Sequence, residues 1–128
     1  MYIVYKRVTT INEALAALNN DNSKLIAGGT DLLLKIKHGI AVVKTMVDIS
    51  QIENFCYIQE NSDMIHIGAW TKIKDLIDSE LIGLSTPLIA QIAQEIGSPE
   101  IRNVATFGGN ICAARANCST FFCRDAKL

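Results

Sequence analysis

The sequence predicts an α/β (α+β) fold with two subdomains, and three observations indicate it. Residues 1–54 alternate short apolar runs with stretches whose apolar residues recur at helical spacing. From residue 55 an alternating hairpin pattern comes first, followed by apolar stripes at helical spacing. Hydrophobic residues make up 49% and charged residues 20% of the 128 residues, which suits a globular protein of one domain or two small subdomains.

Composition and charge exclude two classes of partner. The formal net charge is −1 and no basic stripe is present, so nucleic acid is not expected as the main partner. No apolar run is long enough to span a membrane, and Met1 is not followed by a signal peptide. We therefore expect a cytoplasmic protein with no membrane partner.

Residues 1–54 are expected to form a small β-α-β subdomain with a parallel sheet. In chain order the predicted elements are a strand over Tyr2–Tyr5, a helix capped by Thr10, a strand over Leu25–Ala27, a helix over Asp31–Lys37 and a strand over Val42–Asp48. Strands that alternate with helices pair in parallel through right-handed crossovers. A ligand is expected at the carboxyl end of the middle strand, Leu25–Ala27.

The caps and apolar spacing of these two helices predict which side chains reach the core. Thr10 and Glu13 form a capping box, Thr30 can cap the second helix, and Gly39 is expected to end it. The run Leu25–Ala27 is continuously apolar, as a strand covered on both faces would be. The side chains expected to face inward are Ile11, Leu15 and Leu18 in the first helix and Leu32, Leu33 and Ile36 in the second.

Residues 55–128 are expected to form the N-terminal part of a second α/β subdomain. Two alternating strands, Phe55–Glu60 and Met64–Ala69, meet across a polar turn and predict a hairpin. Thr71 is expected to cap the next helix, Pro87 to open a further one, and Ser98-Pro99 to begin a short turn. The stripes expected in the core are Ile73, Leu76 and Ile77, and then Leu88, Ile89, Ile92, Ala93 and Ile96.

Two glycine pairs are the strongest chemical signals in the chain. Gly28 and Gly29 follow a strand pattern and precede a helix, whose start would present unpaired N–H groups to an anion. A second pair lies in Thr106–Asn110. Two such stretches predict one ligand with two adjacent phosphates. The alternative is a pair of tight turns, because the first stretch has neither the glycine pattern of a Rossmann site nor the lysine of a P-loop.

The four cysteines are expected to be free thiols. Cys112, Cys118 and Cys123 cluster, but their spacing does not match a zinc ribbon, a redox CxxC pair or a ferredoxin cluster. The two histidines are isolated in the sequence. No metal site and no catalytic acid–base pair are therefore expected.

Four stretches carry a resemblance to a known family. Lys24–Lys37 (KLIAGGTDLLLKIK) is similar to its first phosphate loop, Val47–Ser50 to the strand end that follows, and Ile67–Thr71 to a third motif. Ile101–Ile111 (IRNVATFGGNI) resembles its second loop and is the most specific piece. The family that these stretches resemble is the FAD-binding subunit, or medium chain, of the molybdenum hydroxylases, which include xanthine dehydrogenase.

The resemblance implies an FAD-binding fold of the PCMH type, with FAD stretched between two α/β subdomains. Main-chain N–H groups of Ala27–Leu32 would bind the pyrophosphate with help from the Thr30 hydroxyl, while Thr106, Gly109 and Asn110 would close the other side. The full set implied at the cofactor is Leu25, Ile26, Ala27, Gly28, Gly29, Thr30, Asp31 and Leu32, together with Ala105, Thr106, Gly108, Gly109, Asn110 and Cys112.

The same resemblance implies electron transfer as the task of this chain. A molybdopterin-binding large subunit would hydroxylate the substrate, and a small subunit with 2Fe–2S clusters would carry the electrons onward. FAD would then pass them to NAD or another acceptor. A purine is the expected substrate of the complex, because xanthine dehydrogenase subunits give the best resemblance. Nicotinate, other aromatic heterocycles and carbon monoxide stay open as substrates.

The resemblance is lost after Ile111 and returns only in Asp125–Leu128. We therefore expect a C-terminally truncated or altered form, with a disrupted reading frame over Ala113–Arg124 as the hypothesis. Strands missing from the second sheet would leave an unpaired edge and exposed apolar surface, which predicts a homo-oligomer formed through that edge.

Two other interpretations stay open from the sequence. One is a non-catalytic truncated domain of the same fold that binds FAD weakly or not at all. The other is a related flavoprotein, such as the reductase acting on UDP-N-acetylglucosamine enolpyruvate, although the lead-in Ile101–Asn103 argues against it.

Overall fold

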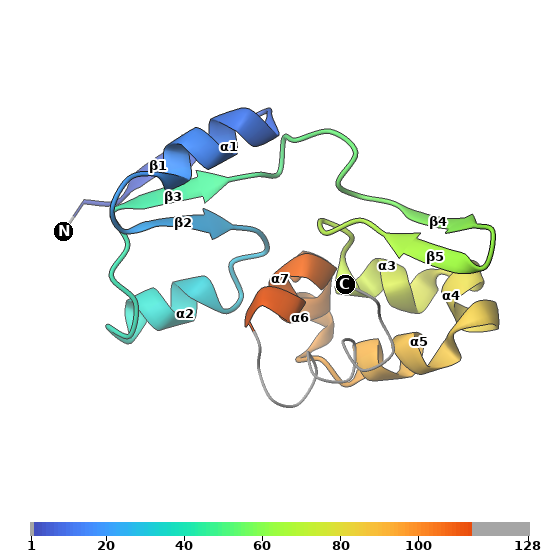
Figure 1. Ribbon diagram of the computed structural model, residues 1–128. Coiled ribbons are helices and arrows are strands. Elements are labelled where there is room, and N and C mark those ends of the chain that lie inside the picture. Colours follow the sequence, from blue (N-terminus) through green and yellow to red (C-terminus); the bar gives the residue numbers. More distant parts are fainter. Residues whose placement is uncertain (1, 114–128) are drawn as a thin grey trace. The chain divides into compact units, whose positions relative to one another are not determined.

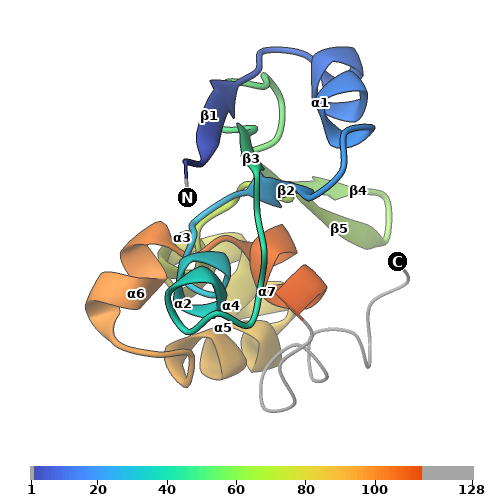
Figure 2. The same cartoon turned by 90° about the vertical axis from the view of Figure 1, so that its left-hand side faces the viewer.

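The computed structural model describes residues 2–113, and the chain divides into two compact units, Met1–Asn54 and Phe55–Leu128 (Figures 1 and 2). Each unit has its own hydrophobic core. The first contains a parallel sheet and two helices, and the second combines a β-hairpin with helices. The α/β (α+β) class is thus confirmed. Within residues 2–113, no helix is long and apolar enough to cross a membrane.

The first unit is built on a three-stranded parallel sheet. Its elements are β1 (Val4–Arg7), α1 (Ile11–Leu18), β2 (Ser23–Ile26), α2 (Leu32–Lys37) and β3 (Thr45–Asp48). The strand order is β1-β3-β2, so the last strand in the chain is inserted between the two earlier ones. Strand β2, the middle strand in chain order, therefore lies at an edge of the sheet. The expectation that it is covered on both faces is wrong, because Leu25 is 44% exposed.

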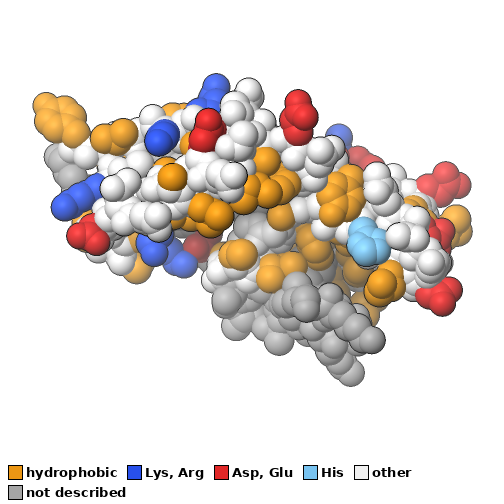
Figure 3. Space-filling view, turned by 45° about the horizontal axis from the view of Figure 1, so that its top comes forward, with side chains coloured by type: hydrophobic (Ala, Val, Ile, Leu, Met, Phe, Trp, Pro, Cys, Tyr) orange, Lys and Arg blue, Asp and Glu red, His pale blue; other side chains and the backbone are white. Residues whose placement is uncertain are grey.

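Helix α1 packs through its small side chains. One buried cluster of this unit consists of Val8, Ala14, Ala17 and Val47, and Val43 is fully buried outside it. Of the predicted stripe only Leu18 packs against this cluster, because Ile11 and Leu15 are 52% and 58% exposed. Since the alanine face covers the sheet, the larger side chains of α1 point outward. Figure 3 shows how exposed apolar side chains lie among polar ones on one face of the molecule.

The predicted caps form only in part. The Thr10 Oγ1 atom accepts the Glu13 N–H at 3.2 Å, but the Glu13 carboxylate accepts the N–H of Thr9, at 2.9 Å, rather than that of Thr10. Thr30 does not cap α2, because Asp31 holds the N-cap position and makes no side-chain capping hydrogen bond. Gly39 does end α2 as expected, with φ at +69° and its N–H donated to an α2 carbonyl.

The inward face predicted for α2 is not buried. All of α2 belongs to the described residues, and none of its side chains is classed as buried. Leu33, expected inside, is 47% exposed, whereas Leu32 and Ile36 are half-buried. The reason is that α1, and not α2, supplies the helix packed against this small sheet.

One carboxylate links the ends of the two paired strands β1 and β3. Asp48, only 5% exposed, accepts hydrogen bonds from the Tyr5 hydroxyl, from Arg7 Nε at 3.0 Å and from the Ser50 N–H at 2.8 Å. Burial raises the pKa of Asp48, but the hydrogen bonds from Tyr5, Ser50 and Arg7 outweigh it and lower this pKa from 3.8 to about 2.

Acid should therefore weaken this unit in a way that depends on Asp48. Because the folded pKa lies below the unfolded value of 3.8, the ionised carboxylate stabilises the fold above about pH 4, and this stabilisation is lost as the pH falls toward 2. We expect Asp48→Asn to lower the free energy of unfolding by about 2 kcal/mol at neutral pH, with the deficit vanishing near pH 2. Urea unfolding followed by circular dichroism across this range measures it, and a pH-independent deficit would contradict it.

The second unit joins a hairpin to a group of short helices. Its elements are β4 (Ile58–Asn61), β5 (Met64–Ile67), α3 (Ile73–Asp78), α4 (Glu80–Ser85), α5 (Pro87–Gln94), α6 (Pro99–Val104) and α7 (Phe107–Ala113). The predicted hairpin is confirmed, with β4 and β5 antiparallel and Ser62 in the turn at φ +55°. Helix α4 was not predicted, and α6 replaces the turn expected at Ser98-Pro99.

The core of this unit is close to the predicted one. The buried cluster consists of Ile73, Leu76, Ala93, Ile96 and Ala105, with Ile77, Ile89 and Ile92 packed against it. Leu88 departs from its predicted stripe and is 51% exposed. Thr71 does not cap α3: its buried Oγ1 instead donates to the Tyr57 carbonyl at 3.0 Å and accepts the Tyr57 N–H at 3.2 Å, which ties the hairpin to the helices.

Candidate functional site

The first glycine stretch is a loop between β2 and α2. The loop begins after Ile26 and ends where α2 starts at Leu32. Gly29 has φ at +73°, a conformation that glycine adopts without strain. Its carbonyl accepts the N–H of Leu33 at 3.1 Å, so the loop curls directly into the helix.

Hydrogen-bond donors at the centre of this loop are unused. Within residues 2–113, the N–H groups of Gly28, Gly29 and Thr30 donate to no protein acceptor. Asp31 follows them, and its carboxylate is paired with Lys35 Nζ at 2.7 Å, which offsets its negative charge beside the loop. Three successive free amides with a compensated carboxylate can accept an anion through the main chain.

The second glycine stretch is a helix and not a loop. Residues from Phe107 onward form α7, so both glycines of the pair are helical. Its first amides are already engaged: the Phe107 N–H donates to the Thr71 carbonyl at 2.8 Å and the Gly108 N–H to the Ala69 carbonyl at 2.9 Å. The expectation of two loops that both offer free amides is therefore corrected to one such loop.

The next two amides of α7 are engaged by its own cap. The Gly109 N–H donates to Thr106 Oγ1 at 3.1 Å, and the Asn110 N–H donates to the Thr106 carbonyl at 2.9 Å. Thr106 is 1% exposed and Ala105 is 4% exposed, so both side chains belong to the interior of the unit. The hydroxyl that was expected at the cofactor thus serves as a helix cap.

Gly108 allows its backbone to lie close to another segment of the protein rather than to a ligand. A Cβ atom at this position would lie 2.8 Å from the Ala69 Cβ and 2.9 Å from the Ala69 carbonyl oxygen. Glycine is needed here so that α7 can pack against the segment after β5.

Asn110 differs from its neighbours, because its Oδ1 is buried without a hydrogen-bond partner among the described residues. Cys112, also predicted at the cofactor, is an exposed free thiol.

Sequence reasoning did not predict that the segment from Ala69 to Ile73 holds α7 in place. The Ile73 N–H donates to the Ala105 carbonyl at 3.0 Å, and Lys72 Nζ donates to the Val104 carbonyl at 3.2 Å. The same ammonium lies 4.7 Å from the centre of the Trp70 ring, a cation–π distance. The available signal was the stretch Ile67–Thr71, which resembles a family motif but was not linked to the second glycine stretch.

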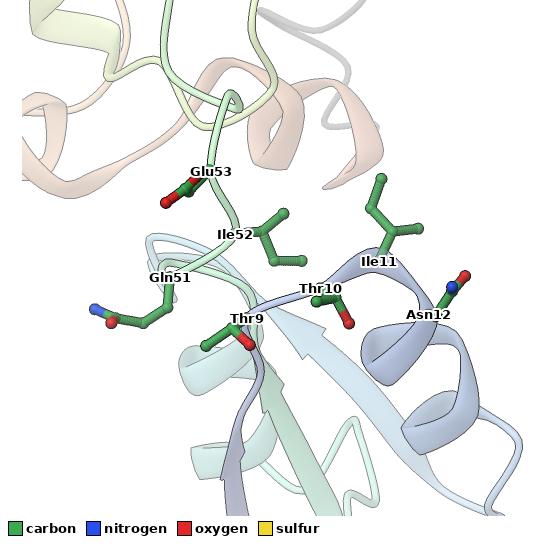
Figure 4. Close-up of a pocket in the computed structure, with 7 residues that line it drawn as sticks. All are labelled: Thr9, Thr10, Ile11, Asn12, Gln51, Ile52 and Glu53. Carbon is green, nitrogen blue, oxygen red and sulfur yellow. The ribbon is translucent and has the colours of Figure 1, made fainter.

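An open depression in the first unit lies apart from the glycine loop. It is lined by Thr9, Thr10, Ile11, Asn12, Gln51, Ile52 and Glu53 (Figure 4). These residues follow the carboxyl ends of β1 and β3, and Gln51 and Glu53 extend away from Ile11 (Figure 4). None of the predicted cofactor residues is among them, so this depression is not the candidate site.

The described residues show no metal site. No group of three or more histidine, cysteine, aspartate or glutamate side chains in residues 2–113 could hold a metal ion. Cys56 and Cys112 are exposed free thiols, while Cys118 and Cys123 lie outside the described residues.

Comparison with known proteins adds a family and close relatives. The family described as "FAD binding domain in molybdopterin dehydrogenase" matches residues 2–124. The xanthine dehydrogenase FAD-binding subunit of Escherichia coli O157:H7 is 36% identical over 129 residues, covering 97% of this chain and 44% of the relative. The carbon monoxide dehydrogenase medium chain of Hydrogenophaga pseudoflava is 36% identical over 109 residues, covering 84% and 38%.

Solved structures agree with these relatives. Carbon monoxide dehydrogenase from Hydrogenophaga pseudoflava, in a form that lacks the Mo-pyranopterin moiety, matches with a TM-score of 0.83 and 34% identity, covering 87% of this chain and 39% of that one. Quinoline 2-oxidoreductase from Pseudomonas putida 86 matches with a TM-score of 0.81 at 19% identity, which speaks for the fold alone. The expected α/β class and the expected FAD-binding fold are therefore both confirmed.

The extent of the match changes one expectation. The family match continues to residue 124 and so covers the whole stretch Ala113–Arg124, where no resemblance was expected. The resemblance therefore continues beyond Ile111 in the family match, whereas the match to the carbon monoxide dehydrogenase medium chain covers 109 residues. The disrupted reading frame is not tested by these matches and stays a prediction. The structure of residues 114–128 lies outside the described part. The chain spans less than half the length of the curated relatives it matches.

Proposed function

Because this chain belongs to the family of FAD-binding domains in molybdopterin dehydrogenases, we propose that it holds FAD as the electron-transfer part of a molybdenum hydroxylase. Its partners would be a molybdopterin-binding large subunit and a 2Fe–2S small subunit, and a purine is the proposed substrate of the complex. When bound, FAD links the one-electron iron–sulfur clusters to a two-electron acceptor such as NAD. The chain's own part is to bind and orient this cofactor.

The observation that carries the proposal is the row of free amides in the first glycine loop. The N–H groups of Gly28, Gly29 and Thr30 donate to no described acceptor, and the diphosphate of FAD offers oxygens that match them. Asp31 would repel a diphosphate, but its pairing with Lys35 at 2.7 Å removes most of that cost. The first loop therefore fits the cofactor.

The second stretch fits the cofactor through a side chain more than through its main chain. The Asn110 Oδ1 atom is buried and unpartnered, and an unpaired buried acceptor costs about 1–3 kcal/mol. A flavin nucleotide has N–H and O–H donors that could satisfy this oxygen. We propose that Gly109, Asn110 and Cys112 contribute contacts to FAD, while Ala105, Thr106 and Gly108 shape the backbone that presents them.

A titration tests this function directly. Trp70 is the only tryptophan in the chain, so its fluorescence reports on added flavin without interference from other indoles. We expect saturable quenching by FAD, competition by ADP, and weaker binding of riboflavin, because riboflavin lacks the diphosphate. Unchanged fluorescence and an unchanged melting temperature at high FAD would refute the proposal.

A second candidate is a non-catalytic domain of the same fold that binds FAD weakly or not at all. The observation that favours it is that every amide from Phe107 to Asn110 donates to an acceptor of the protein itself. Of the two glycine stretches, only the first then offers free amides within residues 2–113. The titration separates the two candidates, since this one predicts no saturation.

A further inference from the structure

We infer that Arg102 is a positioning residue that fastens α6 to the end of α5 and so fixes where α7 begins. The inference rests on the proposed function, because α7 carries the second group of residues assigned to FAD. Arg102 lies in the last turn of α6, three residues before Ala105, which ends α6. Arg102 lies in the stretch Ile101–Asn103, directly before the second glycine stretch. The alternative role is therefore a direct charge contact between Arg102 and the diphosphate.

The guanidinium of Arg102 is committed to main-chain acceptors. Its Nη1 atom donates to the carbonyls of Gln94 at 3.1 Å, Ile96 at 3.1 Å and Gly97 at 3.0 Å. These carbonyls lie at the C-terminal end of α5 and in the turn beyond it, where helices leave acceptors without partners. A cation is also favoured there by the helix dipole. Arg102 thus acts as a charged cap for a neighbouring helix.

The turn between α5 and α6 is tightly held, so a shift of the end of α5 is expected to move the start of α6. Gly97 has φ at +52°, and a Cβ atom there would lie 2.8 Å from Ile101 Cγ2. Ser98 Oγ caps α6 by accepting the Ile101 N–H at 3.4 Å, and Pro99 follows at the helix start. The turn is therefore held from both sides, by Ile101 and by the guanidinium.

Only Ala105 and Thr106 separate the end of α6 from the start of α7. The Ala105 N–H donates to the Ile101 carbonyl at 2.7 Å, and the Ala105 side chain enters the buried core. Thr106, the next residue, caps α7 by accepting the Gly109 N–H. Because Arg102 and the residues from Val104 to Asn110 are held by hydrogen bonds to other segments or by the α7 cap, we expect the loss of the guanidinium to change the position at which α7 begins.

Two substitutions separate the positioning role from a charge contact. Arg102→Lys keeps the charge but replaces the planar, multi-donor guanidinium by a compact ammonium, and Arg102→Met removes the charge. For a positioning residue, we expect both variants to weaken FAD binding by a similar factor of about ten, measured well below their melting temperatures. Both should also speed hydrogen exchange of the α7 amides, while the salt dependence of FAD binding stays as in the wild type.

Lys74→Met is the matched control, since Lys74 is an exposed cation of the same unit paired with Asp78 at 3.6 Å. It should change neither FAD affinity nor exchange in α7. The inference is overturned if Arg102→Lys binds FAD like the wild type while Arg102→Met does not, with a smaller salt dependence, because that pattern marks an ion pair. It is also overturned if α7 exchange is unchanged in both variants. If the wild-type chain takes up no FAD, the proposed function fails, and the exchange rates alone decide the role of Arg102.

Discussion

Replacing Gly68 with alanine should unfold or severely destabilise the second unit. A Cβ atom at this position would lie 2.4 Å from the Phe55 carbonyl oxygen and 2.8 Å from its carbon, which is far closer than such atoms approach. Backbone cannot move aside here, because the Phe55 carbonyl accepts the Trp70 N–H at 2.7 Å and the Gly68 N–H donates to Tyr57 at 2.8 Å. We expect a loss of about 3 kcal/mol in the free energy of unfolding, measured by urea titration with Trp70 fluorescence.

Gly83 supplies the control for this substitution. It lies in the helix α4, and a Cβ atom there would meet nothing within 4 Å. Alanine has the higher helix propensity, so Gly83→Ala should raise the stability by about 0.5–1 kcal/mol. Equal stabilities of the two variants would show that the contact around Gly68 has been misjudged.

Local signals predicted the elements of the first unit better than their packing. Cap residues and apolar spacing placed α1 between residues 11 and 18, and Gly39 marked the end of α2. The inward face of α1 could not be read from spacing, because alanine scores as weakly apolar and yet forms the buried side of this helix. Strand order likewise depends on which pairs form, and nothing within β3 marks it as the central strand.

The second unit shows where a sequence pattern is overridden by tertiary structure. A pair of adjacent glycines favours a loop over a helix by about 1 kcal/mol for each residue, yet Gly108 and Gly109 are helical. The cost is offset because Gly108 packs against Ala69 at a distance that no other residue allows. Helix α6 was missed for a different reason: Ser98 and Pro99 form a good helix start, but a helix of six residues is too short for its apolar spacing to be recognised.

The candidate site was located from sequence mainly by resemblance. The residue types of the two glycine stretches were sufficient to suggest a diphosphate, and the free amides of Gly28 to Thr30 agree with that idea. The assignment of Thr106 illustrates the limit, since a threonine before a glycine pair is compatible with ligand contact and with helix capping alike. The hydrogen bond that its Oγ1 accepts from the Gly109 N–H, at 3.1 Å, identifies it as a cap, and its contact with FAD stays a prediction.

Substitution of Gly29 by alanine should reduce FAD affinity by at least about tenfold while the first unit stays folded. With φ at +73°, alanine at this position is strained by about 1 kcal/mol. Its Cβ atom would also lie 3.0 Å from Leu33 Cδ1. The loop can relieve both by shifting its backbone, and that shift redirects the amides of Gly28 and Thr30 away from the diphosphate. FAD titration against Trp70 fluorescence measures the loss.

Gly39 offers a control at the other end of the same helix. Its φ of +69° is nearly the same, but a Cβ atom there would meet nothing within 4 Å. Gly39→Ala should therefore carry a similar backbone strain and a similar loss of stability, of about 1 kcal/mol, while FAD affinity remains that of the wild type. Because the two variants are matched in backbone strain, a difference in FAD affinity between them reports on the loop around Gly29 and its amides. Equal affinities would show that these amides do not hold the cofactor.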